Sequence, residues 1–359
     1  MNKEAGHEVR IIASTEVYNN EGHFIHTQER EYFNEDGILV KRLEYLDKIP
    51  SKIIHRIRIY KGLYDEIKCF APDVILCHGI QSVDILKVKK YIKNNRNVTL
   101  YVDNHADFNN SAHNIISKIL LHKIVYKAAI QLSLPYIEKV LFLTYESKMF
   151  LKKMYGIPDE KLEYYPLGGK IFSEKERIQF RRIRREELNI QESDILLIHS
   201  GKMQPAKKTE VLLSAFNKVQ SESLKLVIIG NIEDNYSKQI MPLIKSDDRV
   251  KYIGWKTGQE LQEYLCAGDI YVQPGSQSAT MQNALCCGNA VILTPVEAHK
   301  FLLKDAGIYI NNEEELIEVL KKISTDSEYL NDKKRECFKI AETMLDYKKL
   351  AERLVTGFK

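Results

Sequence analysis

The stretch that most constrains this chain is Leu265–Leu293, LCAGDIYVQPGSQSATMQNALCCGNAVIL. The apolar, β-prone run Ile270–Gln273 is followed by an uncharged turn of proline, glycine and hydroxyl residues, and then by a short helix predicted over Met281–Cys287. Ala290–Leu293 is a second apolar strand. This order predicts a parallel α/β domain. The turn also places backbone N–H groups at a helix start, which favours either an anion site or an ordinary βα connection.

The same alternation of strands and helices extends over the whole chain. The length of 359 residues suggests two domains, with their boundary near residues 166–172. Strands are predicted over residues 9–13, 73–77, 98–102, 139–143, 162–165, 195–199, 224–229 and 250–253, besides the two above. Helices are predicted over residues 53–69, 83–93, 113–134, 147–155, 177–188, 209–219, 257–266, 313–323 and 331–355, besides 281–287.

The chain starts with MNKEAGHEVRIIAST. Its first residues resemble the last turn of a helix that ends at Gly6, and a strand follows over residues 9–13. A parallel domain usually has a strand before such a helix. We therefore expect a strand, a loop and a helix before this point, about 25–30 residues by typical element lengths. The alternative is an unusual but genuine start.

Composition excludes several classes of protein. A net charge of +4 is too small to indicate a nucleic-acid binder. The six cysteines form no CxxC pair, and no His or carboxylate cluster at ligand spacing indicates a metal, so neither a metal nor another cofactor is expected. A P-loop and a GxGxxG motif are absent. No apolar run reaches about 18 residues, and we expect a cytoplasmic protein.

The loop Gly201–Lys208, GKMQPAKK, carries the most chemistry. It follows a predicted strand and precedes a predicted helix, so it places two or three ammonium groups beside a helix start. Such a cluster suits a diphosphate leaving group, on which negative charge develops. In the first half, His78 and His105 follow strands, and ligands bind beyond the carboxyl ends of parallel strands. Asp103 and Asp107 flank His105 and would orient its imidazole.

These features together resemble the retaining glycosyltransferases of family 4, which have the GT-B fold. The resemblance covers nearly the whole chain after the expected missing start. It rests on GHEV (6–9), PDVILCH (72–78), YYPLGGK (164–170), SGKMQPAKK (200–208), LVIIGN (226–231), VKYIGW (250–255), AGDIYVQPG (267–275) and NALCCGNAVI (283–292).

The resemblance implies an α/β GT-B fold with two Rossmann-like domains that face each other across a cleft. It implies an acceptor-side domain over residues 1–167, a donor-binding domain over 168–335, and a C-terminal helix over 336–359 that packs back toward the first domain. The implied activity is transfer of a sugar from a nucleotide-sugar donor to a glycan or lipid-linked glycan acceptor, with retention of configuration. Surface polysaccharide biosynthesis is the expected setting.

Site residues are implied position by position. The diphosphate-contacting Arg and Lys of the family fall on Lys202 and Lys207, and its histidine near the acceptor falls on His105. Donor contacts are expected at Gly201, Gly230, Asn231, Trp255, Ser276, Ser278, Thr280 and Asn283.

The chain departs from the family at the Glu-x7-Glu motif. The first glutamate position is Ser278, the second is Asn283, and the loop is three residues shorter. Asn283 can still accept a ribose hydroxyl hydrogen bond, but without the charge that makes such a bond roughly twice as strong. This departure keeps a noncatalytic nucleotide-sugar-binding or partner subunit open as an alternative. Another enzyme with the same fold, an epimerase or a phosphorylase, is a third hypothesis.

The helix predicted over residues 113–134 carries basic residues among apolar ones. They are Lys118, His122, Lys123 and Lys127, among Ile115, Ile119, Leu120, Ile124 and Val125. This pattern predicts peripheral attachment to an anionic membrane, where a lipid-linked acceptor would lie. A core helix with solvated lysines explains the pattern equally well.

Overall fold

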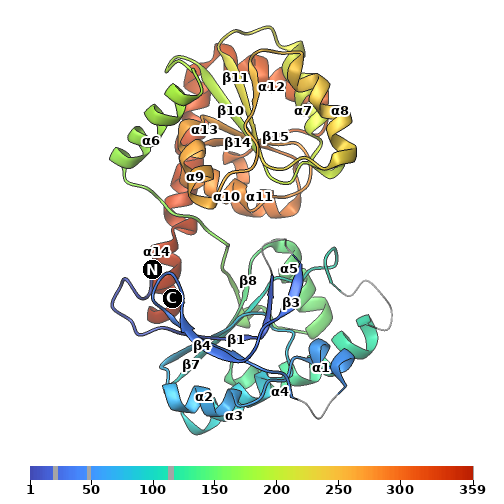
Figure 1. Cartoon of the computed structure of the whole chain (residues 1–359), viewed down its shortest axis with the longest axis vertical. Helices are drawn as coiled ribbons and strands as arrows, with labels where there is room; N and C mark the ends of the chain where they lie inside the picture. Colours follow the sequence, from blue (N-terminus) through green and yellow to red (C-terminus); the bar gives the residue numbers. More distant parts are fainter. Residues whose placement is uncertain (19–22, 47–49, 112–116, 359) are drawn as a thin grey trace. The chain divides into compact units, whose positions relative to one another are not determined.

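The computed structural model describes residues 1–18, 23–46, 50–111 and 117–358. They form two compact units, one of Met1–Pro166 with Ala351–Lys359 and the other of Leu167–Leu350. In Figure 1, each unit has its own strands with helices packed around them. Each unit also has its own large cluster of buried apolar side chains, so each is stabilised by a separate core.

The first unit is built on four parallel strands in the order β6-β7-β8-β9. Nearly all residues of β7 and β8 are buried, as expected for central strands of a parallel sheet. β6 was predicted to be buried as well, but its Leu76 side chain is 40% exposed. The strands are β6 (Val74–Cys77), β7 (Thr99–Asn104), β8 (Lys139–Phe142) and β9 (Leu162–Tyr164).

The helices of the first unit include two where the sequence predicts one over residues 53–69. Arg58 ends the first with a left-handed backbone, at a φ of 53°, and Gly62 has a φ of 65° before the second, so the helical repeat is broken. The helical segments are α1 (Ser51–Ile57), α2 (Leu63–Phe70), α3 (Ile85–Asn94), η1 (Ser117–Tyr126), α4 (Lys127–Ser133), η2 (Leu134–Tyr136), α5 (Tyr145–Phe150), η3 (Leu151–Tyr155) and η4 (Asp159–Lys161).

The described residues before position 46 contain the predicted first strand, β1, and further strands that the predicted alternation did not include. β5 pairs in parallel with β1 and antiparallel with β4, and β2 pairs antiparallel with β3. The antiparallel pairs break the strand–helix alternation expected for this part of the chain. The strands are β1 (Arg10–Ser14), β2 (Glu16–Tyr18), β3 (Phe24–His26), β4 (Arg30–Phe33) and β5 (Leu39–Leu43).

A cavity of about 940 Å³ lies in the first unit, lined by residues of both β1 and β6. β1 pairs with β5 and β6 with β7, and no second strand within the described residues pairs with either. The cavity therefore explains why Leu76 is exposed.

The second unit contains six parallel strands in the order β12-β11-β10-β13-β14-β15. β10 and β13 lie at the centre of the sheet. The carboxyl end of β10 leads into the loop Gly201–Lys208, and that of β13 into the hydroxyl-rich turn over residues 274–279. The strands are β10 (Ile195–Ser200), β11 (Leu224–Ile229), β12 (Val250–Tyr252), β13 (Ile270–Gln273), β14 (Ala290–Leu293) and β15 (Ile308–Tyr309).

The helices of the second unit follow the predicted ranges closely, with two additions, α8 and α11. α8 was not predicted because Pro242 lies within it. The helical segments are α6 (Glu174–Glu187), η5 (Pro205–Lys207), α7 (Thr209–Lys218), α8 (Asp234–Lys245), α9 (Gly258–Ala267), α10 (Thr280–Cys286), α11 (Glu297–Leu303), η6 (Lys304–Ala306), α12 (Glu313–Thr325), α13 (Ser327–Ile340) and η7 (Ala341–Leu345).

The last helix, α14 (Tyr347–Thr356), begins in the second unit and ends in the first. The continuous helix predicted over residues 331–355 is interrupted, because Asp346 has an extended backbone. Within the first unit, Arg353 forms an ion pair with Glu163, and Leu354 packs against Tyr101 and Leu141. These contacts hold residues 351–358 on the first unit.

The predicted helix over residues 113–134 is described only from Ser117, so Ile115 lies outside the described residues, and the Lys118 side chain is not described. His122 was expected on a basic face, but it is buried and hydrogen bonded to Tyr155 at 2.7 Å. An exposed patch remains, which consists of Ile119, Leu120, Lys123, Ile124 and Lys127. Within the described residues, no helix has the length and apolar character that crossing a membrane requires.

Candidate active site

Two glycines bring the loops after β10 and β11 into contact. Gly201 and Gly230 have φ angles of 130° and 136°, which disfavour residues with a side chain. A Cβ atom on Gly230 would lie 1.8 Å from the Gly201 carbonyl oxygen. Gly201 N–H also donates to the Ile229 carbonyl at 2.9 Å. Glycine is therefore required at both positions, because only a residue without a side chain lets the two backbones come this close at the carboxyl edge of the sheet.

Lys207 is the buried cation of this edge. Its side chain leaves the short helix η5, and the residue is only 7% exposed. Its ammonium group donates to the Gln277 carbonyl at 3.3 Å and lies beside Gly201, where a Cβ atom would be 3.7 Å from Nζ. Burial lowers the pKa of Lys207. A buried ammonium next to exposed backbone groups is a preorganised partner for an anion.

Lys202 and Lys208 have different positions from Lys207. Lys202 is exposed and forms an ion pair with Glu233, 2.9 Å from Nζ. To contact a diphosphate, it would have to leave Glu233. Lys208 is also exposed and has a φ of 53°, a conformation that favours glycine. Sequence reasoning did not identify Glu233, because it begins the unpredicted helix α8.

The hydroxyl-rich turn between β13 and α10 packs directly on the lysine loop. Ser276 N–H donates to the Ala206 carbonyl at 2.8 Å, and a Cβ atom on Gly275 would lie 2.2 Å from the same oxygen. Ser278 and Thr280 both lie near the buried hydroxyl of Tyr271. The structure thus brings Gly201, Lys207, Ser276, Ser278 and Thr280 into one site.

Asn283 lies on α10 and faces the segment that enters the second unit. A Cβ atom on Gly169 would be 2.8 Å from Asn283 Oδ1, and this oxygen is buried without a hydrogen-bond partner among the described residues. The neighbouring Gln282 accepts a hydrogen bond from Gly168 N–H at 2.7 Å. α10 therefore holds the Gly168–Gly169 backbone, and a ribose contact by Asn283 stays a prediction.

The remaining expected donor residues lie at the ends of β11 and β12. Gly230 N–H donates to the Gly254 carbonyl at 2.8 Å, and Asn231 accepts from Met203 N–H at 2.7 Å. Trp255 is 62% exposed directly after Gly254. These contacts place Asn231 and Trp255 on the same edge of the sheet as Gly201.

His199 is a buried structural residue that sequence reasoning did not assign. Its Nδ1 is hydrogen bonded to the Val272 carbonyl at 2.8 Å and its Nε2 to Thr209 Oγ1 at 3.0 Å. Burial lowers its pKa to about 4, so it is neutral at physiological pH. It joins β10, β13 and the start of α7 beneath the site.

In the first unit, the carboxyl ends of β6 and β7 bring together His78, Asp103 and His105. His78 Nδ1 donates to Asp103 Oδ2 at 2.7 Å, and His105 Nε2 lies 3.5 Å from the same oxygen. Burial opposes the charged form of Asp103, but hydrogen bonds from His105 and His78 hold its pKa at about 2. The hydrogen bond to Asp103 raises the pKa of His78. The expected pairing of His105 with Asp103 is thus present, and His78 joins it.

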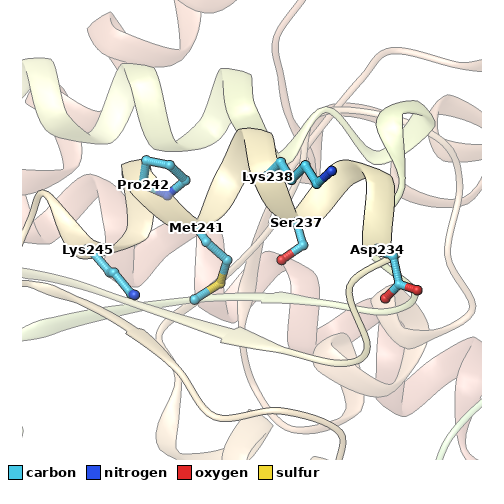
Figure 2. Close-up of a pocket in the computed structure, with 6 residues that line it drawn as sticks. All are labelled: Asp234, Ser237, Lys238, Met241, Pro242 and Lys245. Atoms are coloured by element: carbon cyan, nitrogen blue, oxygen red, sulfur yellow. The ribbon is translucent and has the colours of Figure 1, made fainter.

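A separate surface cavity of about 670 Å³ lies along one face of α8 (Figure 2). None of the expected site residues lines it. Its lining residues are Asp234, Ser237, Lys238, Met241, Pro242 and Lys245. It follows that this cavity is not part of the site at the carboxyl edge.

Comparisons with solved structures identify the fold. Alr3699/HepE from Anabaena, solved in complex with UDP, is 14% identical, with 88% of this chain and 85% of that chain covered and a TM-score of 0.63. Sucrose-phosphate synthase from Thermosynechococcus elongatus is 14% identical over 99% and 89%, with a TM-score of 0.64. A glycosyltransferase from Rickettsia africae is 14% identical over 89% and 84%, with a TM-score of 0.65. The expected α/β fold with two parallel sheets, as in GT-B structures, is confirmed.

Residues 194–326 match the family described as "Glycosyl transferases group 1". A search of curated proteins finds no match. The matched range contains both the lysine loop and the hydroxyl-rich turn. The part of the chain that contains both loops is therefore similar to the group 1 glycosyltransferases, and the fold of the two units is that of GT-B glycosyltransferase structures.

Proposed function

We propose that this protein moves a hexose from a nucleotide-sugar donor to a glycan or lipid-linked glycan, with retention of configuration, in surface polysaccharide biosynthesis. The second unit binds the donor, and the first unit binds the acceptor. UDP-sugars are the first donors to test, because Alr3699/HepE was solved with UDP and with UDP-glucose. Cytoplasmic placement of the enzyme follows from the use of a nucleotide sugar.

The observation that carries the proposal is the buried Lys207 ammonium at the loop edge. A front-face retaining transfer needs no protein nucleophile, because the bond to the leaving diphosphate lengthens first. Charge then builds on the diphosphate oxygens, where a fixed cation stabilises the transition state. Lys207 has no carboxylate partner within 4 Å among the described residues, so its charge is available to the diphosphate.

On the acceptor side, His105 contacts the transferred sugar or the acceptor, and Asp103 positions it. The carboxylate stays ionised at any physiological pH, since its pKa is about 2. It therefore holds His78 and His105 in fixed orientations and favours the protonated form of His78.

A noncatalytic, donor-binding subunit is the second candidate, because Ser278 and Asn283 replace the two family carboxylates. The buried Asn283 Oδ1 without a partner favours this candidate, since it faces Gly169 and lacks a charge.

Turnover of a panel of nucleotide sugars separates the two candidates. Released nucleoside diphosphate and equilibrium binding would be measured for UDP-, GDP- and ADP-sugars with glycan and lipid-linked acceptors. We expect at least one donor to be turned over. Binding of a donor without turnover on any acceptor would support the subunit instead, and absence of both would contradict the proposal.

The exposed patch of Ile119, Leu120, Lys123, Ile124 and Lys127 supports a further part of the proposal, which is attachment to an anionic membrane. Apolar side chains enter the headgroup boundary while lysines contact anionic lipids. Leu120 is the most exposed of the three apolar residues, at 59%.

Leu120→Asp should weaken sedimentation with phosphatidylserine vesicles by roughly tenfold or more, since one buried leucine contributes about 2 kcal/mol. Ile178→Asp, at an equally exposed apolar position on α6, is the matched control and should bind like the wild-type protein. Equal sedimentation of all three proteins, or none by the wild type, would count against attachment.

A further inference from the structure

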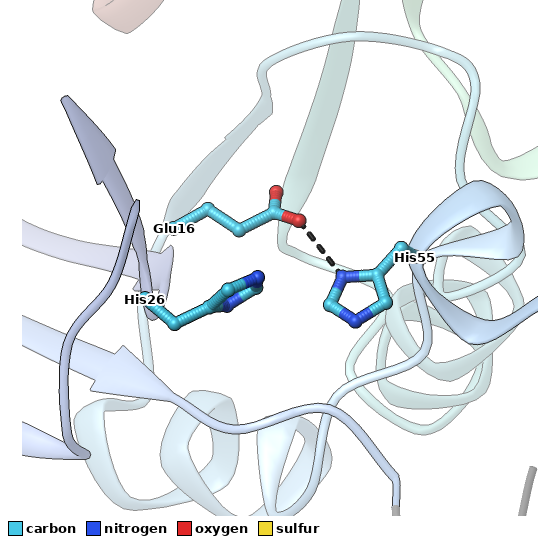
Figure 3. A group of neighbouring side chains, drawn as sticks. All are labelled: Glu16, His26 and His55. Carbon is cyan, nitrogen blue, oxygen red and sulfur yellow. Dashed lines mark hydrogen bonds and ion pairs between the residues drawn. The ribbon is translucent and has the colours of Figure 1, made fainter. Parts of the chain in front are cut away.

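Three potential metal ligands converge in the first unit, away from His78 and His105. They are Glu16 on β2, His26 on β3 and His55 on α1. One ligand atom from each lies within 4.8 Å of the others. Figure 3 shows the three side chains reaching one another from separate elements. Because the residues are far apart in sequence, no ligand-spacing motif predicts the cluster.

The geometry of the cluster is close to that of a metal site. His55 Nδ1 and Glu16 Oε1 are 2.9 Å apart, and the His26 and His55 rings are edge to face with centroids 4.9 Å apart. Tetrahedral zinc holds its nitrogen and oxygen ligands at about 2.0–2.2 Å, which places the ligands about 3.3 Å from one another. Small side-chain rotations would bring all three atoms to that spacing.

The surroundings favour a bound ion as well. Arg42 Nη1 binds the carbonyl oxygens of Ser14 and Glu16, which fixes the backbone at the start of β2. The Tyr45 ring lies against the His55 ring, with the centroids 4.5 Å apart and the planes tilted by 56°, and its hydroxyl is buried. A phenol hydroxyl at this position can hydrogen bond to a metal-bound water.

The other His and carboxylate cluster is a weaker candidate. Both oxygens of Asp103 already accept hydrogen bonds, Oδ2 from His78 and Oδ1 from Gly79 N–H at 2.6 Å. No backbone N–H donates to the Glu16 carboxylate among the described contacts. The lone pairs of Glu16 are thus more available to a cation.

We propose that Glu16, His26 and His55 bind one zinc ion, with water as the fourth ligand. Two imidazoles and one carboxylate suit zinc, whose three-ligand sites keep one position for water. His26 is exposed and the other two ligands are half-buried, so the ion reaches the site from solvent. Bound zinc fastens the β2–β3 hairpin to α1.

Zinc titration of the full-length protein, in competition with a chromophoric chelator, tests the proposal. We expect one equivalent of zinc to bind to the wild type, and Glu16→Gln and His55→Ala each to weaken binding at least about 100-fold, since even indirect supporting partners are worth 10–100-fold. His78→Ala is the matched control, a histidine paired with a carboxylate in the other cluster, and should leave zinc binding unchanged.

Absence of zinc binding by the wild type would overturn the proposal whether or not the variants fold. So would full binding by both Glu16→Gln and His55→Ala, or loss of binding in His78→Ala alone, which would place the ion at Asp103. Co²⁺ would be added in place of zinc, and a visible spectrum typical of tetrahedral coordination is expected. The outcome is independent of donor turnover, so it does not depend on the proposed function.

Discussion

Lys207→Ala should lower kcat by roughly two to three decades while it changes donor affinity much less. The buried ammonium acts mainly where charge develops on the leaving diphosphate, and loss of one such contact typically costs about 3–4 kcal/mol in the transition state. Its fixed position beside Gly201 and the Gln277 carbonyl makes this a property of the folded loop. Steady-state kinetics and calorimetric donor binding would measure the two effects separately.

Lys208→Ala is the matched control, since the neighbouring lysine is exposed and follows the same loop. It should keep most of the turnover. Lys202→Ala should also lower kcat strongly if Lys202 leaves Glu233 to bind the diphosphate.

Turnover of the wild-type enzyme should also depend on alkaline pH. Burial lowers the pKa of Lys207, so the ammonium group loses its proton, and turnover falls, at a lower pH than for a lysine with an ordinary pKa. Wild-type turnover in Lys207→Ala would rule out this role.

Asp269→Ala should destabilise the second unit by about 3–5 kcal/mol, because it leaves buried cations without their counter-ion. Asp269 is almost fully buried between β13, α6 and α13. Its carboxylate lies 2.6 Å from Arg185, 2.8 Å from Lys334 and 3.2 Å from Arg181. Leu196 N–H also donates to it at 2.9 Å. Denaturant unfolding would measure the change in free energy.

The contribution of Asp269 also depends on pH. Burial opposes its charge, but Lys334, Arg181 and Arg185 hold its pKa below the usual value. A carboxyl group whose pKa is lower in the folded than in the unfolded state stabilises the fold fully above the unfolded pKa, which is about 3.9 for Asp. This stabilisation is lost as the pH falls through the folded-state pKa. The difference in unfolding free energy between the wild type and Asp269→Ala should therefore be largest at neutral pH and become smaller below about pH 4.

Lys300→Ala removes an exposed i,i+3 ion pair with Glu297 and should change the unfolding free energy little. An equally small change in Asp269→Ala would contradict the buried-charge account. The Asp269 carboxylate joins α6 and α13 to the central strands, which is a physical reason for a carboxylate at this position.

The second unit could be predicted well from the sequence, because its strands are short apolar runs buried on both faces. Helix starts were also visible, as at Thr257, whose side chain caps α9 in a reciprocal pair with Glu260. The turn chemistry after β10 and β13 predicted a donor site at these strand ends, and that role stays a prediction. Lys207, Ser276 and Gly201 do meet there, because strand ends in a parallel sheet share one edge.

Other features depended on packing that local sequence does not encode. The burial of His122 depends on Tyr155, 33 residues later, and the exposure of Leu76 depends on the cavity beside β6. The ion pair of Lys202 requires Glu233, at the start of an unpredicted helix. Asn283 was assigned from its motif position, but its environment at Gly169 depends on how the entering backbone packs on α10.

Hydrogen–deuterium exchange, measured with and without the nucleoside diphosphate of the preferred donor, tests whether the carboxyl edge of the second sheet binds the donor. Slower exchange is expected in three segments together, residues 201–208, 230–231 and 274–280. The α8 cavity, over residues 234–245, serves as the internal reference and should not change. Protection confined to α8, or to the first unit, would contradict the account.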